Sequence, residues 1–255
     1  MHLDYDTDDG AGWRARLGLI VLQGDETLES EFRRFLDVDG VALYVTRVPS
    51  GLEVNNESLA AMADHIPAAA RLLPPATELD VVGYACTSGA TVIGTDEVAR
   101  LIRGARPTHD AGSFANAAIT DPLTAVVAAC RTLGAARIGF VTPYVADVSY
   151  SMRTVLEGQG LEIAGFGSFE QGEERIVARI APASIHAAIL QVGRAAPCDA
   201  VFVSCTNART LDILDAAESD LGLPVVSSNQ ALAWHMLRSA GIDDPRPDLG
   251  RLFRA

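Results

Sequence analysis

Two ten-residue stretches of the sequence match each other, residues 80–89 and residues 199–208. The first reads Asp-Val-Val-Gly-Tyr-Ala-Cys-Thr-Ser-Gly and the second reads Asp-Ala-Val-Phe-Val-Ser-Cys-Thr-Asn-Ala. In each stretch an aspartate precedes an apolar run, and a Cys-Thr pair follows it. A short apolar run of this kind is typical of a buried strand, and the small polar residues after it indicate a turn. Each stretch is therefore predicted to be a strand that ends at a cysteine, Cys86 in the first and Cys205 in the second.

The similarity extends upstream of these strands. Residues 16–21 (Arg-Leu-Gly-Leu-Ile-Val) match residues 137–142 (Arg-Ile-Gly-Phe-Val-Thr). The first match lies 70 positions before Cys86 (86 − 16), and the second lies 68 positions before Cys205 (205 − 137). Matching units at nearly equal separation indicate an internal repeat. The chain is therefore expected to form two similar halves, related by a pseudo-two-fold axis, with a cleft between them. The expected domains are residues 1–117 with 228–255, and residues 118–227.

Short apolar runs alternate with longer stretches of helical spacing along the whole chain. This alternation is typical of parallel sheets with crossover helices, so the expected fold class is α/β. Strands are predicted at 16–22, 41–48, 80–85, 137–142, 200–204 and 224–227. Helices are predicted at 57–73, 91–103, 121–133, 147–159, 182–195 and 210–221.

Composition limits the possible functions. The chain has 255 residues, of which 49% are hydrophobic, so a disordered protein is excluded. The net charge of −13 argues against a nucleic-acid partner, which needs a basic surface. The sequence shows no apolar run of the roughly 18 residues that a membrane span requires, and the acidic N-terminus lacks the features of a signal peptide. We expect a cytoplasmic protein without a membrane partner, whose four cysteines are reduced.

The two repeat cysteines are candidates for catalysis. In open parallel sheets, ligands bind just beyond the carboxyl ends of the strands, which is where Cys86 and Cys205 are expected. A helix starting after each cysteine would favour a thiolate and also bind an anion. Further donors for a substrate carboxylate would come from four neighbouring residues, Thr87, Ser88, Thr206 and Asn207. Cys130 and Cys198 lie outside the repeat and are interpreted as structural residues. No spacing typical of a metal site is present in the sequence.

The motifs that contain the cysteines resemble a known family. Gly-Tyr-Ala-Cys-Thr-Ser-Gly at 83–89 and Val-Ser-Cys-Thr-Asn at 203–207, with Thr-Pro-Tyr at 142–144 between them, are similar to the aspartate/glutamate racemase superfamily. The nearest branch is that of the maleate cis–trans isomerases and arylmalonate decarboxylases. The resemblance runs from about Arg16 to Gly241 and includes Leu-Gly-Leu-Pro-Val-Val-Ser-Ser-Asn-Gln at 221–230. It implies two domains with the active site between them, no cofactor, and a homodimer or higher homo-oligomer.

The resemblance also implies roles for individual residues. Tyr144 matches a family tyrosine that donates to the substrate carboxylate. Arylmalonate decarboxylases have a glycine where Cys86 stands, so the presence of both thiols favours isomerisation over decarboxylation. In maleate isomerases, which this chain resembles, asparagines stand at the positions that match Asp25 and, in a looser alignment, Glu174. A carboxylate repels a second carboxylate and attracts an ammonium group. The alternative for Asp25 is that it only caps the helix that begins near Thr27.

Several functions share the same two thiols. The main expectation is a cofactor-independent racemase or isomerase for a small, amino-acid-like carboxylate, such as a diaminobutyrate derivative, by analogy with superfamily members associated with ectoine utilisation. One thiolate would remove a proton and the opposite thiol would deliver one. The alternative is a maleate cis–trans isomerase, in which a thiolate adds to the double bond. An arylmalonate-type decarboxylase and a non-catalytic small-molecule binding protein are less favoured.

Overall fold

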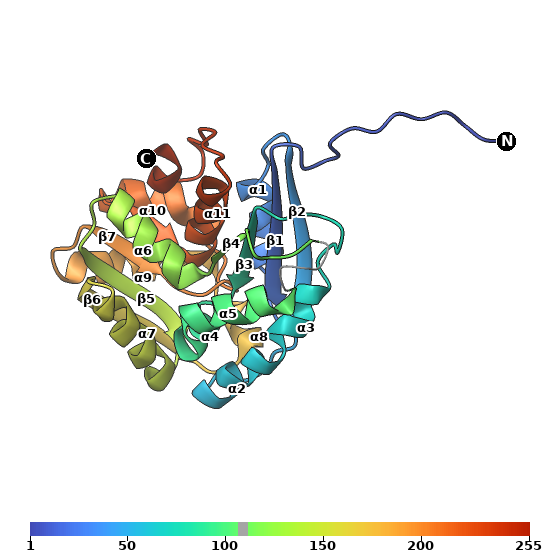
Figure 1. Cartoon of the computed structure of the whole chain (residues 1–255). Helices are drawn as coiled ribbons and strands as arrows, with labels where there is room; N and C mark the ends of the chain where they lie inside the picture. Colours follow the sequence, from blue (N-terminus) through green and yellow to red (C-terminus); the bar gives the residue numbers. More distant parts are fainter. Residues whose placement is uncertain (107–111) are drawn as a thin grey trace.

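The computed structural model of the chain contains two four-stranded parallel sheets with the same strand order; it describes residues 1–106 and 112–255. The first sheet has the order β2-β1-β3-β4 and the second the order β6-β5-β7-β8. Helices surround both sheets (Figure 1). The α/β class and the two similar halves predicted from the repeat are therefore confirmed. The strands are β1 (Ala15–Leu22), β2 (Val41–Val48), β3 (Val81–Ala85), β4 (Ala118–Thr120), β5 (Arg137–Tyr144), β6 (Glu162–Gln171), β7 (Ala200–Val203) and β8 (Val225–Ser227).

The aspartate that begins each repeat motif makes the same contacts in both halves. Asp80 Oδ2 accepts a hydrogen bond from the backbone N–H of Arg16 at 2.7 Å, and its own N–H donates to the Arg16 carbonyl at 2.9 Å. Asp199 Oδ2 accepts from the N–H of Arg137 at 2.7 Å, and its N–H donates to the Arg137 carbonyl, also at 2.7 Å. These matched pairs fix the register of the two central strands in each sheet. As a result, the strands that lead to the cysteines, β3 and β7, occupy equivalent positions.

Helices connect the strands and cover the faces of both sheets. Figure 1 shows α6, α7, α9 and α10 around the second sheet, with α1 to α5 around the first. One hydrophobic cluster runs through both halves and contains residues of both sheets, such as Leu19, Tyr84, Phe140 and Phe202. The helices are α1 (Leu28–Phe35), α2 (Asn56–Ala61), α3 (Ile66–Arg71), α4 (Thr87–Ile93), α5 (Thr95–Ala105), α6 (Pro122–Thr132), α7 (Ala146–Gly158), α8 (Glu174–Val177), α9 (Pro182–Ala195), α10 (Leu214–Leu221) and α11 (Ser228–Ser239), with 3₁₀ turns η1 (Met62–Asp64), η2 (Leu211–Ile213) and η3 (Arg251–Arg254).

The structure departs from the predicted elements at several places. The helix predicted at 57–73 is broken into α2, η1 and α3, and Pro67 lies in the first turn of α3. Gly94, with φ +94°, separates α4 from α5 within the helix predicted at 91–103. In place of the helix predicted at 210–221 there is η2 followed by α10. The strands β4 and β6 and the helices α1, α8 and α11 were missing from the predicted list, although a helix start near Thr27 was anticipated.

The missed elements have physical explanations. β4 has three residues, too few for a periodic pattern. β6 is an edge strand whose residues are partly or fully exposed, so glycine, serine and charged residues interrupt its apolar pattern. The expected domain boundary at 117/118 falls directly before β4, which belongs to the first sheet. Among the described helices, none has the length and apolar character needed to cross a membrane.

Candidate active site

Cys86 lies at the junction between β3 and α4. It is the residue that precedes the first turn of α4, and its Sγ accepts a hydrogen bond from the backbone N–H of Gly89 at 3.1 Å. The hydroxyl of Ser88 is 3.6 Å from the same sulfur. Cys86 is 1% exposed. A helix start after this cysteine was predicted, and the structure confirms it here.

The turn after Cys86 has room for glycine alone at position 89. A Cβ placed on Gly89 would lie 2.6 Å from Tyr84 Oη, 2.9 Å from Cys86 Sγ and 2.9 Å from Met62 Cε. All three distances are shorter than van der Waals contact. Gly89 therefore allows the backbone to approach the thiol closely enough to donate to it.

Cys205 has a different backbone environment, and here the prediction was wrong. A turn follows it instead of a helix, and the next helical residues are those of η2, which starts at Leu211. Cys205 itself has φ +101°, which is unusual for a residue with a side chain. Its Sγ accepts hydrogen bonds from Tyr144 Oη at 3.0 Å and from the N–H of Asn207 at 3.3 Å. The donors at this thiol therefore come from a tyrosine and a turn, and not from a helix start.

Hydrogen bonds join the two cysteine motifs. The hydroxyl of Ser228 is 2.8 Å from the hydroxyl of Thr87 and accepts from the backbone N–H of Cys205 at 3.0 Å. The hydroxyl of Thr206 donates to the carbonyl of Ala85, the residue before Cys86, at 3.4 Å. Thr206 thus contacts the residue before Cys86, and Thr87 and the Cys205 backbone share the Ser228 hydroxyl, so the two cysteine motifs lie next to each other.

Asp25 plays the capping role that was one of its two predicted interpretations. Its Oδ1 accepts from the backbone N–H of Thr27 at 2.8 Å and of Leu28 at 2.8 Å, which satisfies donors at the start of α1. Its Oδ2 is buried and has no hydrogen-bond partner among the described residues. The Thr206 hydroxyl lies close enough to lower the pKa of Asp25, and the hydrogen bond that its geometry supports is donation to the Ala85 carbonyl at 3.4 Å. The cap therefore uses one oxygen of Asp25 and leaves the other available.

Asn207 connects the Asp25 turn with Glu174. Its Nδ2 donates to Glu174 Oε2 at 3.0 Å, and its Oδ1 accepts from the N–H of Glu26 at 2.9 Å. The hydroxyl of Thr27 donates to the Asn207 carbonyl at 2.9 Å. Glu174, in the first turn of α8, is 6% exposed, and Asp25 is 5% exposed. Asn207 thus bridges the turn that carries one buried acid and the side chain of the other.

The pKa shifts show that these groups form one electrostatic cluster. Burial is the main cause that raises the pKa of Cys86, to about 12, and that of Cys205 well above its usual value. The charges of Glu174 and Asp25 raise the pKa of both thiols further. The pKa of Tyr144 is raised by burial and then by the charges of Cys205, Glu174 and Cys86. Desolvation thus opposes the thiolate that the nearby N–H donors favour, and the thiolate expected at both cysteines stays a prediction.

Three further residues support the site and were not among the sequence candidates. Ser228 lies within the motif at 221–230, and no role was predicted for it. Glu31 on α1 is buried and accepts from the backbone N–H groups of Thr210 and Leu211 at 2.6 and 2.8 Å. It also accepts from Asn229 Nδ2 at 2.8 Å. Tyr84 lies next to Cys86. Burial is the main cause that raises the pKa of Tyr84, and the charge of Cys86 raises it further. Tyr84 stands in the apolar run directly before Cys86, which was a visible signal, whereas the partners of Glu31 lie 179 to 198 positions away in sequence.

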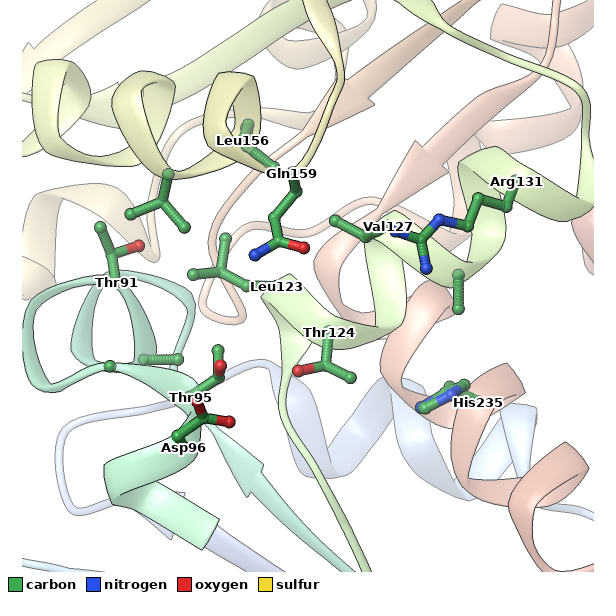
Figure 2. Close-up of a pocket in the computed structure, with 14 residues that line it drawn as sticks. Thr91, Thr95, Asp96, Leu123, Thr124, Val127, Arg131, Leu156, Gln159 and His235 are labelled. Atoms are coloured by element: carbon green, nitrogen blue, oxygen red, sulfur yellow. The ribbon is translucent and has the colours of Figure 1, made fainter.

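A separate cavity of about 450 Å³ lies beyond the other end of α4. Figure 2 shows its side chains, which come from α4, α5, α6, α7 and α11, with Asp96, Arg131 and His235 at different sides. His235 Nδ1 is 2.7 Å from the Thr120 hydroxyl, and burial lowers the pKa of the imidazole. None of the predicted site residues lines this cavity. In the part of the chain that the structure describes, no group of three metal-ligating side chains is present.

Comparison with known proteins gives consistent matches. The sequence model of the arylmalonate decarboxylase family matches residues 49–253. The maleate isomerase of Nocardia farcinica is 29% identical over 244 residues, which are 94% of this chain and 95% of that protein. The arylmalonate decarboxylase of Bordetella bronchiseptica is 35% identical over 132 residues, 51% of this chain and 55% of that protein.

A solved structure extends the comparison to the whole fold. It is a cysteine-to-serine mutant of the Nocardia farcinica maleate cis–trans isomerase with a covalently bound succinylcysteine intermediate. Its TM-score with this chain is 0.81 at 26% identity, and the match covers 94% of this chain and 98% of that one. The two-half architecture is therefore shared over nearly the full length of both chains.

Proposed function

Because the chain belongs to the arylmalonate decarboxylase family, within the Asp/Glu racemase-like superfamily, we propose that it is a cofactor-independent isomerase that acts on a small carboxylate with Cys86 and Cys205. The reaction that the relatives favour is cis–trans isomerisation of a maleate-like acid. The observation that carries this proposal is the buried polar connection between the two thiols. Ser228 links the residue after Cys86 to the backbone of Cys205, and Tyr144 donates directly to Cys205.

The proposed reaction begins with one cysteine as a thiolate. Its sulfur adds to one carbon of the double bond, and the π electron pair moves to the neighbouring carbon, where it takes up a proton from the opposite side of the substrate. The former double bond is now single and rotates. The same proton then leaves, the carbon–sulfur bond breaks, and the double bond re-forms in the trans geometry. Nothing is oxidised or reduced, so the reaction balances without a cofactor.

Because the pKa of both thiols is raised, neighbouring groups must stabilise the thiolate that the reaction needs. A thiolate at Cys205 would be stabilised by the Tyr144 hydroxyl and the Asn207 N–H, both of which already donate to the sulfur. At Cys86 the corresponding donors are the Gly89 N–H and the Ser88 hydroxyl. Binding of a substrate that displaces solvent and supplies hydrogen bonds would complete the conversion of the thiol to a thiolate. In this proposal Tyr144 and Ser88 turn between the sulfurs and the substrate carboxylate.

Racemisation of an amino-acid-like substrate is the second candidate. Two thiols on opposite sides of one carbon suit the removal and delivery of a proton as well as they suit addition. The observation that favours this candidate is the pair of buried acids, Asp25 and Glu174, in the same cluster. Decarboxylation needs one thiol only, and a binding protein needs none, so neither accounts for both cysteines.

The test is product analysis of the wild-type protein in D₂O. The protein is incubated with maleate, with an arylmalonate and with single enantiomers of small amino acids, and each mixture is followed by ¹H NMR and chiral chromatography. The proposal expects fumarate from maleate, or α-deuteration with loss of optical purity from an amino acid. Release of carbon dioxide from the arylmalonate, with no isomerised or racemised product, would contradict it.

A further inference from the structure

Asp25 and Glu174 are unusual as neighbours of two catalytic thiols. Asp25 and Glu174 are 5% and 6% exposed as residues, and burial is the main cause that raises the pKa of each. The Asp25 charge raises the pKa of Glu174 further, so the two groups are close enough to repel each other. Buried like charges are costly unless something neutralises them.

The cations near the two acids have other partners. The guanidinium of Arg47 donates to the backbone carbonyls of Leu22, Gln23 and Asp25 at 3.0 to 3.1 Å and forms an ion pair with Glu29. The Arg47 charge lowers the pKa of Asp25, but it does so less than the neighbouring hydrogen-bond donors do, and burial has a larger effect still in the opposite direction. Arg179 forms an ion pair with exposed Glu26 at 2.9 Å. Neither arginine donates a hydrogen bond to the carboxylate of Asp25 or Glu174.

The free oxygen of Asp25 is the second observation. Oδ1 holds the start of α1, while Oδ2 is buried without a hydrogen-bond partner among residues 1–106 and 112–255. A buried polar atom without a partner is rare in folded proteins and needs a physical reason. An acceptor of this kind, beside a second carboxylate and two thiols, is suited to a ligand that donates hydrogen bonds and carries positive charge.

We propose that Asp25 and Glu174 form a subsite for an ammonium group, and that the substrate is a small carboxylate which also carries an amine. This inference rests on the proposed function for the location of the substrate at the two thiols. It holds for either reaction there, because an amino acid carries an ammonium group on the reacting carbon, and an unsaturated acid with an allylic amine carries one on the carbon beside the double bond.

The subsite has a consequence for the chemistry. The charges of Glu174 and Asp25 are among the causes that raise the pKa of Cys86 and Cys205. An ammonium group between the carboxylates would offset these charges and lower the pKa of both thiols. Binding of the amine would therefore promote formation of the thiolate in the same step. A dicarboxylate without an amine would instead add negative charge and oppose it.

The test compares ligands that differ by one amine. Aspartate is compared with succinate, and 2-aminobutyrate with butyrate, by isothermal titration calorimetry. The proteins are the wild type, Asp25→Asn, Glu174→Gln and the control Glu26→Gln, an exposed acid beside Asp25. Asparagine can cap α1 almost as well as aspartate, and glutamine can still accept from Asn207, so both site variants are expected to fold.

The expected result is that at least one amine-bearing ligand binds the wild type tenfold or more tightly than its partner. Asp25→Asn and Glu174→Gln should each weaken that ligand by about ten- to a hundred-fold, the range of a charge-assisted hydrogen bond. Succinate should bind these variants equally or better, and Glu26→Gln should change nothing. If the amine gives no advantage in the wild type, if neither pair binds, or if Asp25→Asn weakens both members of a pair equally, the subsite is wrong.

The two proposals fail separately. Cysteine-dependent conversion of maleate without any preference for amines would overturn the ammonium subsite and leave the isomerase in place. A clear preference for amines, lost in Asp25→Asn, together with no isomerised or racemised product from any acid, would overturn the isomerase and leave the subsite. Protonated Asp25 that donates to a substrate carboxylate, as an amide would, predicts equal binding of succinate by wild type and Asp25→Asn, with no advantage for aspartate.

Discussion

Cys205 shows how a single residue depends on contacts that the sequence does not reveal. Its φ of +101° lies in a region that residues with a Cβ rarely occupy and that costs about 1–3 kcal/mol. The bonds from Tyr144 and Asn207 to its sulfur, and from its own N–H to Ser228, hold it there. The repeat predicted that this residue matters and that it follows a strand. It could not predict the backbone, because two of the three partners, Tyr144 and Ser228, come from other parts of the chain.

Asp25 illustrates the opposite case. Both of its predicted roles, a helix cap and a charge facing the site, followed from its position in the sequence. The structure assigns the cap to one oxygen and leaves the other without a partner among the described residues. The sequence presented these two interpretations as alternatives, but the structure allows both at once.

A test of the charge cluster is the reactivity of the thiols. Negative neighbours raise the pKa of a thiol, so removing one negative charge lowers it. Asp25→Asn and Glu174→Gln should therefore shift the pH profile of iodoacetamide labelling at Cys86 and Cys205 to lower pH. At pH 8 we expect about three- to tenfold faster labelling, since one pKa unit is a factor of ten in thiolate. Mass spectrometry of the labelled peptides measures each cysteine separately.

The control for this measurement is Glu26→Gln, which removes an exposed charge. Its labelling profile should coincide with that of the wild type. Because burial is the largest cause of both thiol shifts, the variant profiles should remain above the pH range of an ordinary cysteine. A profile that moves to higher pH in Asp25→Asn would contradict the assignment of these charges.

Among the elements, the junction between β3 and α4 places a candidate catalytic residue, Cys86, at the start of a helix. The pattern predicted one helix at 91–103, whereas the structure starts α4 at Thr87 and begins a second helix after Gly94. The helical spacing was correct, but the apolar pattern could not locate the start, because Cys86 performs the capping that serine or aspartate usually provides. The small residues after Cys86 were the visible signal.

Gly89→Ala tests this junction. The added methyl group would clash with Tyr84, Cys86 and Met62, so we expect a loss of about 1–3 kcal/mol in unfolding free energy, together with a large loss of activity. The matched control is Gly104→Ala in α5, where a Cβ meets nothing within 4 Å. That change should stabilise the protein by roughly 0.5–1 kcal/mol and leave activity unchanged. Urea unfolding and turnover are measured for both, and a harmless Gly89→Ala would refute the tight packing.

α11 marks the limit of prediction from local pattern. It follows β8 directly and is capped by Ser227, whose side chain accepts from the N–H of Gln230 at 3.2 Å. Most of the helix is buried on all sides, so it lacks the one-sided apolar spacing that identifies a surface helix. It packs against α6, α1 and β3, and it places Ser228 between the two cysteine motifs. A helix buried by tertiary packing of this kind leaves no clear period in the sequence.

At the scale of the whole molecule, the repeat was the most informative signal. It predicted two similar halves and brought the two cysteines to one place without any knowledge of helix boundaries. What it could not predict is how the halves are held together. Glu31 on α1 reaches the residues after Cys205 and also accepts from Asn229 on α11. These four donors, including the Thr210 hydroxyl, are buried with it.

Glu31→Ala should therefore destabilise the protein strongly. The change leaves two backbone N–H groups, a hydroxyl and an amide without their acceptor, and we expect a loss of about 3–5 kcal/mol in unfolding free energy. Glu57→Ala, at an exposed position in α2, serves as the control and should change the free energy by less than about 0.5 kcal/mol. Urea denaturation followed by circular dichroism compares them. Equal midpoints for the two variants would show that Glu31 does not connect the halves.

In the proposed mechanism both thiols are required for one reaction. The most direct measurement is turnover, by ¹H NMR in D₂O, of the acid that the wild type converts, by Cys86→Ala, Cys205→Ala and the control Cys130→Ala. Cys130 is a buried residue of α6 outside the repeat. We predict that each site variant remains folded and loses at least about a thousandfold in rate, as expected when a nucleophile or proton donor is removed, while Cys130→Ala retains most of the activity. Wild-type turnover by Cys86→Ala or by Cys205→Ala would contradict the two-thiol mechanism.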